Sequence, residues 1–275
     1  MHPWPGDTTG WTPFLHLVSL HVYPIKACHG LDLNSAAVGT LGLDGDRRWL
    51  ITDSQGTFLT QRELPALARL QPSITSEGLH LTNGDGETLT VTLPAPGSAR
   101  LPVRVWRSHL EAPLADDATH AWLTRALGRD CRLVYMPDDL IRETNPDYSQ
   151  PGDRVSFADG YPLLLTTMTS LQSLNDHLDE PVPMARFRPN LVIDGTTPFA
   201  EETWRTVTIG ETVFDVVKPC ERCVVITVDQ QTGVLTGKEP LKTLAGLRAP
   251  GKVVFGVNLI PRRLGTLRTG DPVSV

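Results

Sequence analysis

The 275-residue chain lacks a basic excess and long apolar runs. It has 25 Lys and Arg against 31 Asp and Glu, which gives a formal net charge of -6. Proteins that neutralise nucleic-acid phosphates usually carry a basic surplus, so we expect no nucleic-acid partner. The apolar stretches are too short for a membrane span or a secretory leader, and residues 1–17 contain no Lys or Arg. The sequence therefore predicts a cytoplasmic protein with no membrane partner.

Cysteine is scarce, with four in the chain. A structural zinc site usually needs two cysteine pairs, but only Cys220 and Cys223 are close in sequence, while Cys28 and Cys131 are isolated. The ferredoxin spacing of cysteines and the G-x-G-x-x-G dinucleotide fingerprint are also missing. We therefore expect no haem, flavin or iron–sulfur cluster in this chain, and thiols rather than disulfides in a reducing compartment.

Short apolar runs bounded by turn residues fill the sequence and predict a mainly β fold with some helix. The first part is typical of a small β-barrel or sandwich. Helical spacing follows Asp116 and ends at Gly128, and shorter helices are predicted at 169–178 and 240–248. The polar, proline-rich stretch 137–154 favours a linker or mobile loop. We predict two domains, 14–135 and 136–275.

One short motif, VKPCERCVVITVDQQTG from Val217 to Gly233, places two cysteines among charged residues. A redox Cys-x-x-Cys pair sits at a helix N-terminus, whereas the run CVVITVD is strand-like, which disfavours thiol–disulfide exchange. Two ordinary core cysteines remain an alternative, because free cysteine is often buried. The neighbours Lys218 and Arg222 favour a third interpretation, in which one thiolate binds a soft transition metal and nearby cations hold an anionic cofactor.

The segment KPCERCVVITVDQQTG resembles the signature of the MOSC family, the molybdenum-cofactor-sulfurase C-terminal domain, and especially its mitochondrial amidoxime reducing component branch. Further segments resemble that family in order along the chain: VYPIKACHG, LDGDRRWLI, RFRPNLVIDG, FGVNL and the terminal GDPV. The resemblance covers nearly the whole sequence. It implies an N-terminal β-barrel-like domain followed by a β-barrel MOSC domain.

The resemblance also implies a site for Mo-molybdopterin. Cys223 would be the metal ligand and the catalytic residue, with Cys220 as a supporting neighbour. The other cofactor contacts that it implies are Lys26, Arg47, Arg188, Asn190, Arg222 and Asn258, with Thr166, Thr167 and Met168 as weaker candidates. Arginine suits the cofactor phosphate because its fork can bind two oxygens, whereas Thr167 could equally be a helix N-cap. Ala27 departs from the serine that relatives often have.

The implied activity is two-electron reduction of N-hydroxylated compounds, such as amidoximes, hydroxylamines and N-hydroxylated bases. The resemblance implies that electrons come from a separate ferredoxin- or cytochrome-type donor with its reductase. One alternative is a sulfur carrier, or a protein that binds or transfers the molybdenum cofactor without turnover of its own. Another is a β-rich binding protein without redox activity.

Overall fold

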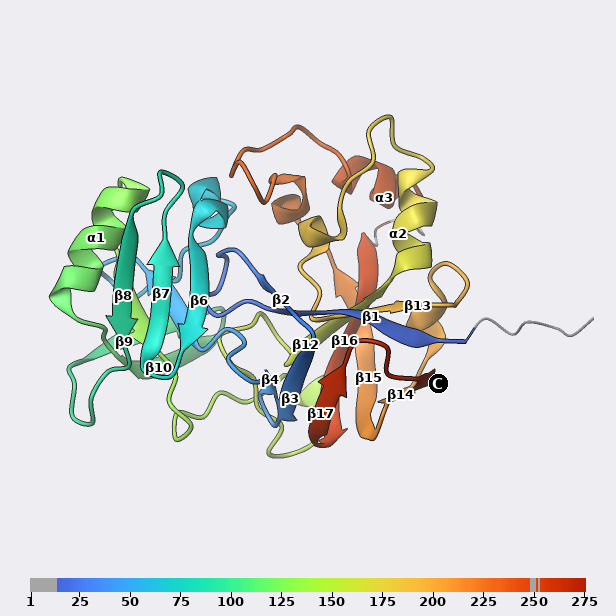
Figure 1. Cartoon of the computed structure of the whole chain (residues 1–275), viewed down its shortest axis with the longest axis horizontal. Helices are drawn as coiled ribbons and strands as arrows, with labels where there is room; N and C mark the ends of the chain where they lie inside the picture. The colour runs from blue at the N-terminus through green and yellow to red at the C-terminus, as the bar shows by residue number, and fades with distance from the viewer. Residues whose placement is uncertain (1–13, 248–250, 252) are drawn as a thin grey trace, which may run out of the picture.

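The computed structural model describes residues 14–247, 251 and 253–275, which form two lobes side by side (Figure 1). Strands dominate both lobes, so the prediction of a mainly β fold with some helix is confirmed. Residue 248, the predicted end of the last helix, lies outside the described residues, and the observed helix α3 spans Leu241–Leu247. No described helix is long and apolar enough to cross a membrane.

The C-terminal lobe is built on an eight-stranded sheet in the order β18, β14, β15, β16, β12, β13, β1, β2. The pair β12–β13 is parallel, and the other neighbours are antiparallel. A small sheet of β17, β3 and β4 lies beside it. The strands are β1 (His16–Val22), β2 (Leu31–Leu33), β3 (Ser35–Gly39), β4 (Gly42–Leu43), β12 (Leu163–Thr167), β13 (Leu191–Asp194), β14 (Thr206–Ile209), β15 (Thr212–Glu221), β16 (Val254–Arg263), β17 (Gly265–Arg268) and β18 (Val273–Ser274).

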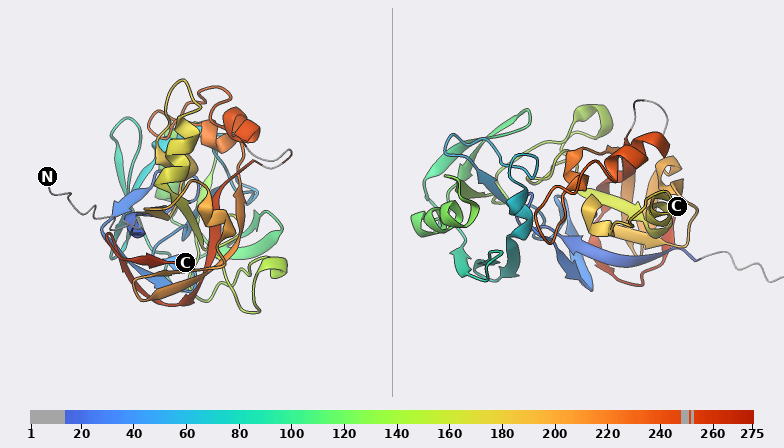
Figure 2. Two further views of the ribbon diagram at one scale, coloured as in Figure 1. Left: turned by 90° about the vertical axis from the view of Figure 1, so that its right-hand side faces the viewer. Right: turned by 90° about the horizontal axis from the view of Figure 1, so that it is seen from above.

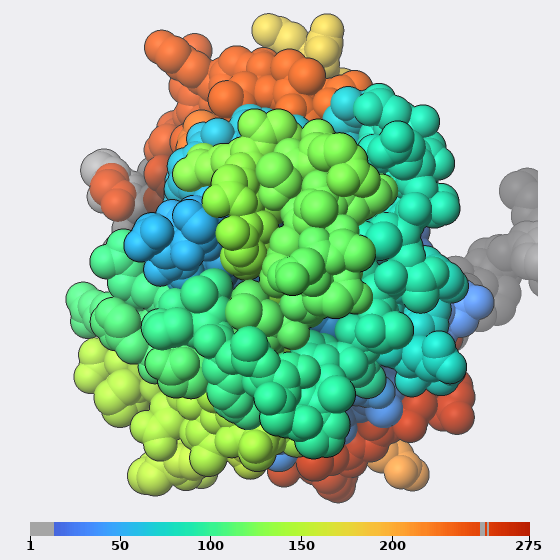
Figure 3. Space-filling model, turned by 90° about the vertical axis from the view of Figure 1, so that its left-hand side faces the viewer, coloured from blue at the N-terminus to red at the C-terminus, as the bar shows by residue number. Residues whose placement is uncertain are grey.

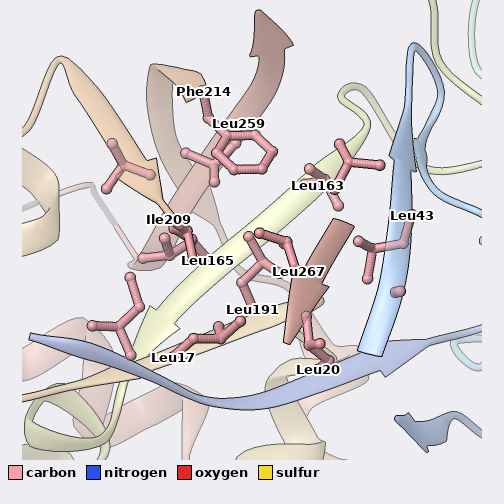
Figure 4. Close-up of a cluster of buried hydrophobic side chains, with 14 of the residues drawn as sticks. Leu17, Leu20, Leu43, Leu163, Leu165, Leu191, Ile209, Phe214, Leu259 and Leu267 are labelled. Atoms are coloured by element: carbon pink, nitrogen blue, oxygen red, sulfur yellow. The ribbon is translucent and has the colours of Figure 1, made fainter. Parts of the chain in front are cut away.

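Leucine side chains from the first and last thirds of the chain share the core of this lobe. They point toward one another between the large sheet and the small one (Figure 4). Burial of each such side chain contributes about 1.5–3 kcal/mol, so this core binds the N-terminal strands firmly to the C-terminal ones. The residues labelled there are Leu17, Leu20, Leu43, Leu163, Leu165, Leu191, Ile209, Phe214, Leu259 and Leu267.

The N-terminal lobe contains three smaller sheets around two adjoining cores. Its strands pair as β5 with β11, β9 with β10, and β6 with β7 with β8. The bounds are β5 (Trp49–Thr52), β6 (Gln71–Thr75), β7 (Gly78–Thr82), β8 (Thr88–Thr92), β9 (Arg100–Val105), β10 (Ser108–Pro113), β11 (Arg132–Tyr135), the 3-10 helix η1 (Pro65–Arg69) and α1 (Asp117–Leu127).

Helix α1 begins and ends where its sequence predicts. The Asp116 side chain accepts a hydrogen bond from the amide of Thr119, and Gly128 ends the helix with a left-handed backbone at φ 64°. Trp122 and Leu123 lie on one face and pack into the core of the N-terminal lobe. Spacing and caps together therefore sufficed to locate this element.

The expectation of a strand over CVVITVD is wrong. Strand β15 ends at Glu221, and Val224–Thr227 form a 3-10 helix, η5. The Thr227 hydroxyl donates to the carbonyl of Val224, and Ile226 turns into a core that includes Phe187. Local hydrogen bonding and this tertiary contact outweigh the β-propensity of the run. The other short helices of this lobe are α2 (Met168–Asn175), α3 (Leu241–Leu247), η3 (Met184–Phe187) and η4 (Ala200–Thr203).

The stretch 137–154, expected to be a linker or mobile loop, contacts the rest of the chain at several positions. It holds one 3-10 helix, η2 (Pro146–Tyr148), and the buried Arg142, whose guanidinium donates to the carbonyls of Ser156, Ala158 and Asp159. Arg262 forms an ion pair with Asp153, at 2.6 Å. These acceptors offset the cost of removing the arginine charge from water, so Arg142 holds this stretch against the segment that follows it.

The two lobes are joined by several passages of the chain. Strand β1 belongs to the C-terminal lobe, Ile25 and Cys28 pack in the N-terminal core, and β2, β3 and β4 return to the C-terminal side. The chain then builds β5–β11 and returns between Tyr135 and Leu163 (Figure 2). Seen from its own side, the N-terminal lobe covers most of the other one (Figure 3). The division at 135/136 stays a prediction, although β11 does end at Tyr135.

Candidate functional site

A pocket lies where these passages meet, with about 940 Å³ of empty space that is partly open to solvent. Six basic side chains line it, against two carboxylates. It brings together most of the residues that the resemblance implies: Lys26, Arg47, Arg188, Asn190, Arg222, Cys223 and Asn258. Residues separated by more than half the sequence thus share one concave, cationic wall.

Cys220 and Cys223 both line the pocket as free thiols. Cys223 is exposed and stands directly before η5, while Cys220 is half-buried and accepts a hydrogen bond from the Arg222 guanidinium at 2.9 Å. The other two cysteines, Cys28 and Cys131, are fully buried, and burial raises the pKa of their thiols to about 12 and about 11. The ordinary core interpretation therefore suits Cys28 and Cys131 and not the pair in the pocket.

Two guanidinium groups flank the buried ring of Tyr23. The Cζ atom of Arg47 lies 4.4 Å from the ring centroid and that of Arg188 lies 4.3 Å from it. Burial raises the pKa of Tyr23 to about 12, so its hydroxyl stays protonated and donates to the carbonyl of Pro189. Burial also lowers the pKa of Arg188 to about 10, which still leaves the guanidinium charged at neutral pH. The ring therefore contacts both cations and helps to hold each of them at the pocket wall.

Arg47 is oriented by two further residues. Its Nη1 atom donates to the carboxylate of Asp46 at 2.6 Å and to the side-chain oxygen of Asn190 at 3.1 Å. The Asn190 oxygen also accepts from the amide of Leu164, and its amide nitrogen donates to the carbonyl of His21. Asn190 is thus engaged mainly with the protein, and its direct effect in this structure is to hold Arg47.

Several buried N–H groups of the pocket have no acceptor in the described part of the chain. They belong to Nη2 of Arg188, Nε of Arg222 and Nε of Arg186. No described carboxylate forms an ion pair with Arg188 or Arg222. Buried donors without partners cost about 1–3 kcal/mol each and are rare. Donors of this kind, beside an exposed thiol, fit an anionic, thiolate-ligated group such as Mo-molybdopterin.

Lys26 enters the pocket from the loop after β1. Only 6% of this residue is exposed, and its Nζ atom lies 2.5 Å from a carboxylate oxygen of Asp159. Burial lowers the pKa of Lys26, and the charge of Asp159 opposes that change. The same oxygen of Asp159 accepts from the indole nitrogen of Trp106 at 3.1 Å. Lys26 can offer its remaining N–H groups to an anion in the pocket.

Backbone strain gathers at this site. Five described non-glycine residues have a left-handed backbone, and four of them line the pocket: Ala27, Arg47, Trp106 and Arg188. Such conformations cost of order 1–3 kcal/mol each and persist where the surrounding structure imposes them. Their concentration around one cavity supports a functional role for it.

The three weaker candidates do not line the pocket. The Thr166 hydroxyl donates to the sulfur of Met184, and the Thr167 side chain caps α2 by accepting from the amide of Ser170. Met168 is 39% exposed at the start of the same helix. The N-cap interpretation of Thr167 accounts for its position, because a hydroxyl at that point satisfies a free helix amide. Asn258 does reach the pocket, from β16, and donates to the carbonyl of Lys218.

Sequence reasoning missed several pocket residues. Asp159, Trp106 and Gln61 stand outside the quoted segments, and only the fold brings them to this wall. Arg186 could have been found, because it stands two residues before Arg188 in the quoted segment RFRPN. It donates to Asp229 at 3.2 Å and so holds the turn after η5 in place.

Comparisons with known proteins identify the family of this chain. The MOSC N-terminal beta barrel domain matches residues 14–130, and the MOSC domain matches residues 152–274. Mitochondrial amidoxime-reducing component 1 of Homo sapiens is 33% identical, over 94% of this chain and 82% of its own length. The protein of the same name from Mus musculus is 34% identical, over 94% and 81%.

A second kind of relative is the molybdenum cofactor sulfurase of Oryza sativa subsp. japonica. It is 35% identical over 89% of this chain, which spans only 32% of that protein. Both kinds match most of the chain. The chain belongs to the MOSC family, with an N-terminal MOSC beta barrel domain preceding its MOSC domain.

Proposed function

We propose that this protein is a molybdenum-cofactor oxidoreductase that reduces N-hydroxylated compounds. In the proposed reaction the N–O bond of the substrate breaks, two electrons and two protons are consumed, and the products are the corresponding N–H compound and water. The relatives named amidoxime-reducing components support this assignment at the level of the family. The substrates would be amidoximes, hydroxylamines or N-hydroxylated bases.

The observation that carries the proposal is the pairing of an exposed thiol with unpaired cations. Cys223 lies at the surface of a pocket whose buried guanidinium N–H groups, on Arg188 and Arg222, have no acceptor in the described residues. Such donors suit an anionic cofactor held by charge-assisted hydrogen bonds. An exposed thiol with basic neighbours suits a soft metal.

Each pocket residue has a definable task in this proposal. Cys223 would hold the molybdenum, and Arg188, Arg222 and Lys26 would bind the anionic groups of the pterin. Arg47 is already fixed by Asp46 and would meet the cofactor without a further loss of side-chain entropy. When bound, the molybdenum cofactor supplies a two-electron redox centre that can take an oxygen atom from the substrate. The protein supplies binding, orientation and electrostatics.

Electrons would come from a separate protein, of the ferredoxin or cytochrome type, together with its reductase. The exposure of Cys223 supports transfer at the open side of the pocket, where a partner can approach. Encounters of this kind usually use small, partly polar interfaces. A loosely docked donor would therefore suffice.

The test is molybdenum content and turnover in Cys223→Ala beside the wild type. Protein from a cofactor-competent host would be analysed for molybdenum and assayed for amidoxime reduction with reduced viologen. We expect stoichiometric metal and turnover in the wild type, and neither in the variant. Cys131→Ala, which removes a fully buried thiol of the other lobe, is the matched control and should retain both. A wild type without molybdenum, or a Cys223→Ala variant that keeps it, would overturn the assignment.

A second candidate function is supported by the sulfurase relatives. In that alternative Cys223 would carry sulfane sulfur or receive the cofactor for transfer, and the protein would have no turnover of its own. The exposed thiol of Cys223, with the half-buried Cys220 nearby in sequence, is compatible with such a role. Cyanide-releasable sulfur on the purified protein, together with absent amidoxime reduction by molybdenum-loaded protein, would favour this alternative.

A further inference from the structure

The hairpin between β9 and β10 carries an unusual residue in its turn. Val105 pairs with Ser108, so Trp106 and Arg107 form a two-residue connection. Trp106 has φ 56°, in the left-handed region. Two-residue hairpins need a positive φ at their first central position, where Gly, Asn and Asp predominate. A tryptophan at this position is strained.

The strain is not offset by burial of the indole. Trp106 is 46% exposed, although it lines the pocket. Its ring contacts Phe58, with centroids 5.2 Å apart and planes tilted by 56°, and the Cζ atom of Arg62 lies 5.1 Å from its centroid. A large aromatic residue normally stabilises a fold by removing its surface from water, and here much of that surface stays accessible.

The indole is nevertheless held in one orientation. Its nitrogen donates to Asp159, whose carboxylate is also paired with Lys26. The carbonyl of Asp159 in turn accepts from the buried Arg142. Asp159, which is held by Lys26 and Arg142, therefore positions the exposed indole at the pocket. An exposed aromatic ring that is both strained and locked is the arrangement expected of a ligand-binding surface.

We infer that Trp106 is a specificity-determining residue, on whose ring the flat, conjugated part of an N-hydroxylated substrate stacks. This inference rests on the proposed function and names a substrate class for the same site. Compounds in which the carbon bonded to the N-hydroxylated nitrogen is conjugated with an aromatic ring have a π face to offer. Analogues with a saturated ring have none. Trp106 comes from the N-terminal lobe and Cys223 from the C-terminal lobe, so the substrate would lie between them.

The experiment compares two probes of matched size, benzamidoxime and cyclohexanecarboxamidoxime, on the molybdenum-loaded protein. For each we would measure kcat/KM with reduced viologen, and Kd by calorimetry on the oxidised protein. Trp106→Leu keeps apolar bulk and removes the aromatic face, so the preference for benzamidoxime should fall about tenfold in both measurements. Trp106→Phe keeps a face and should retain most of the preference.

Two further variants separate specificity from folding. Arg107→Ala changes the neighbouring turn residue, which does not line the pocket, and should leave the preference unchanged. Trp106→Gly relieves the strained φ, so its urea midpoint should equal or exceed that of the wild type while the preference is lost.

An unchanged preference in Trp106→Leu, or a wild type that binds neither probe, would overturn the inference. Equal turnover of both probes by the wild type would also overturn it while leaving the proposed function intact. Binding of benzamidoxime that depends on Trp106, without turnover, would support the stacking surface and count against the proposed reaction.

Discussion

The side-chain amides of Gln61 and Gln230 form a reciprocal pair of hydrogen bonds between the two lobes. The Gln61 amide nitrogen donates to the Gln230 oxygen at 3.0 Å, and the Gln230 nitrogen donates to the Gln61 oxygen at 2.9 Å. Gln61 also donates to the carbonyl of Ala27, and the Gln230 oxygen accepts from Arg188 at 3.1 Å. Both glutamines are buried, so this network fixes Arg188 relative to the N-terminal wall of the pocket.

The change Gln230→Leu should therefore weaken both the fold and the site. It leaves donors of Gln61 and Arg188 without their acceptor, and each such buried group costs about 1–3 kcal/mol. We expect the free energy of unfolding in urea to fall by about 2 kcal/mol, and molybdenum retention to fall with it. Gln172→Ala, at an exposed position of α2, should change stability by less than about 0.5 kcal/mol. Equal midpoints for Gln230→Leu and the wild type would contradict this account.

Arg188→Lys tests whether the guanidinium fork binds the cofactor. Lysine keeps the positive charge, but it cannot supply the planar donors that Arg188 directs into the pocket. A charge-assisted hydrogen bond contributes about 1.5–3 kcal/mol, so we expect cofactor affinity to fall by about tenfold or more. The measurement is molybdenum per chain after extended dialysis. Arg268→Lys, at an exposed position of β17, is the control, and equal retention in both variants would exclude the proposed contact.

The buried carboxyl of Glu201 predicts a pH-dependent stability. Burial raises its pKa, although hydrogen bonds from Ser170 and Thr167 oppose that change. Below the unfolded-state pKa of about 4.3, Glu201 is protonated in both the folded and the unfolded state, so its titration does not change the free energy of unfolding. Above that pKa the Glu201 carboxyl ionises in the unfolded chain while it stays protonated in the folded one. The free energy of unfolding therefore decreases as the pH rises through the folded-state pKa.

Glu201→Gln removes this titration. We expect the difference in unfolding free energy, variant minus wild type, to increase as the pH rises above about 4.3 and then to level off. Urea titrations from pH 4 to pH 8 would measure it. Glu211→Gln, at an exposed position, should show no such trend, and a flat difference for Glu201→Gln would refute the assignment.

Arg142→Met should loosen the segment that presents Asp159. The buried guanidinium donates to the carbonyls of Ser156, Ala158 and Asp159, and methionine replaces none of these bonds. Hydrogen bonds from a charged group contribute about 1.5–3 kcal/mol each, so a loss of about 3 kcal/mol is expected. The urea midpoint measures it. The control is Arg154→Met, which removes one exposed hydrogen bond, and it should have little effect.

Local signals predicted some of the regular elements, helix α1 above all. The caps Asp116 and Gly128 located α1, and apolar runs bounded by turn residues located some of the strands, because these features depend on nearby positions. The same reasoning failed at Val224–Thr227, where β-branched residues form a 3-10 helix. There the contact of Ile226 with a distant core decided the conformation.

The site was predictable as far as the family resemblance extended. Lys26, Arg188 and Cys223 stand in recognisable segments and do meet in one pocket. The strained Trp106 stands outside those segments. The sequence also could not reveal the amide pair of Gln61 and Gln230, or the arginine that holds Asp159, because these contacts span long separations and need the finished fold.

The repeated passage of the chain between the lobes has a consequence for the lifetime of the bound state. Lys26, Arg47 and Asp159 all lie on connecting segments rather than inside either lobe. Swinging the lobes apart would strain several covalent connections at once, so a simple clamshell motion is disfavoured. We expect a cofactor enclosed there to exchange slowly, at a rate set by partial unfolding of those segments, and to be acquired most readily while the chain is still folding.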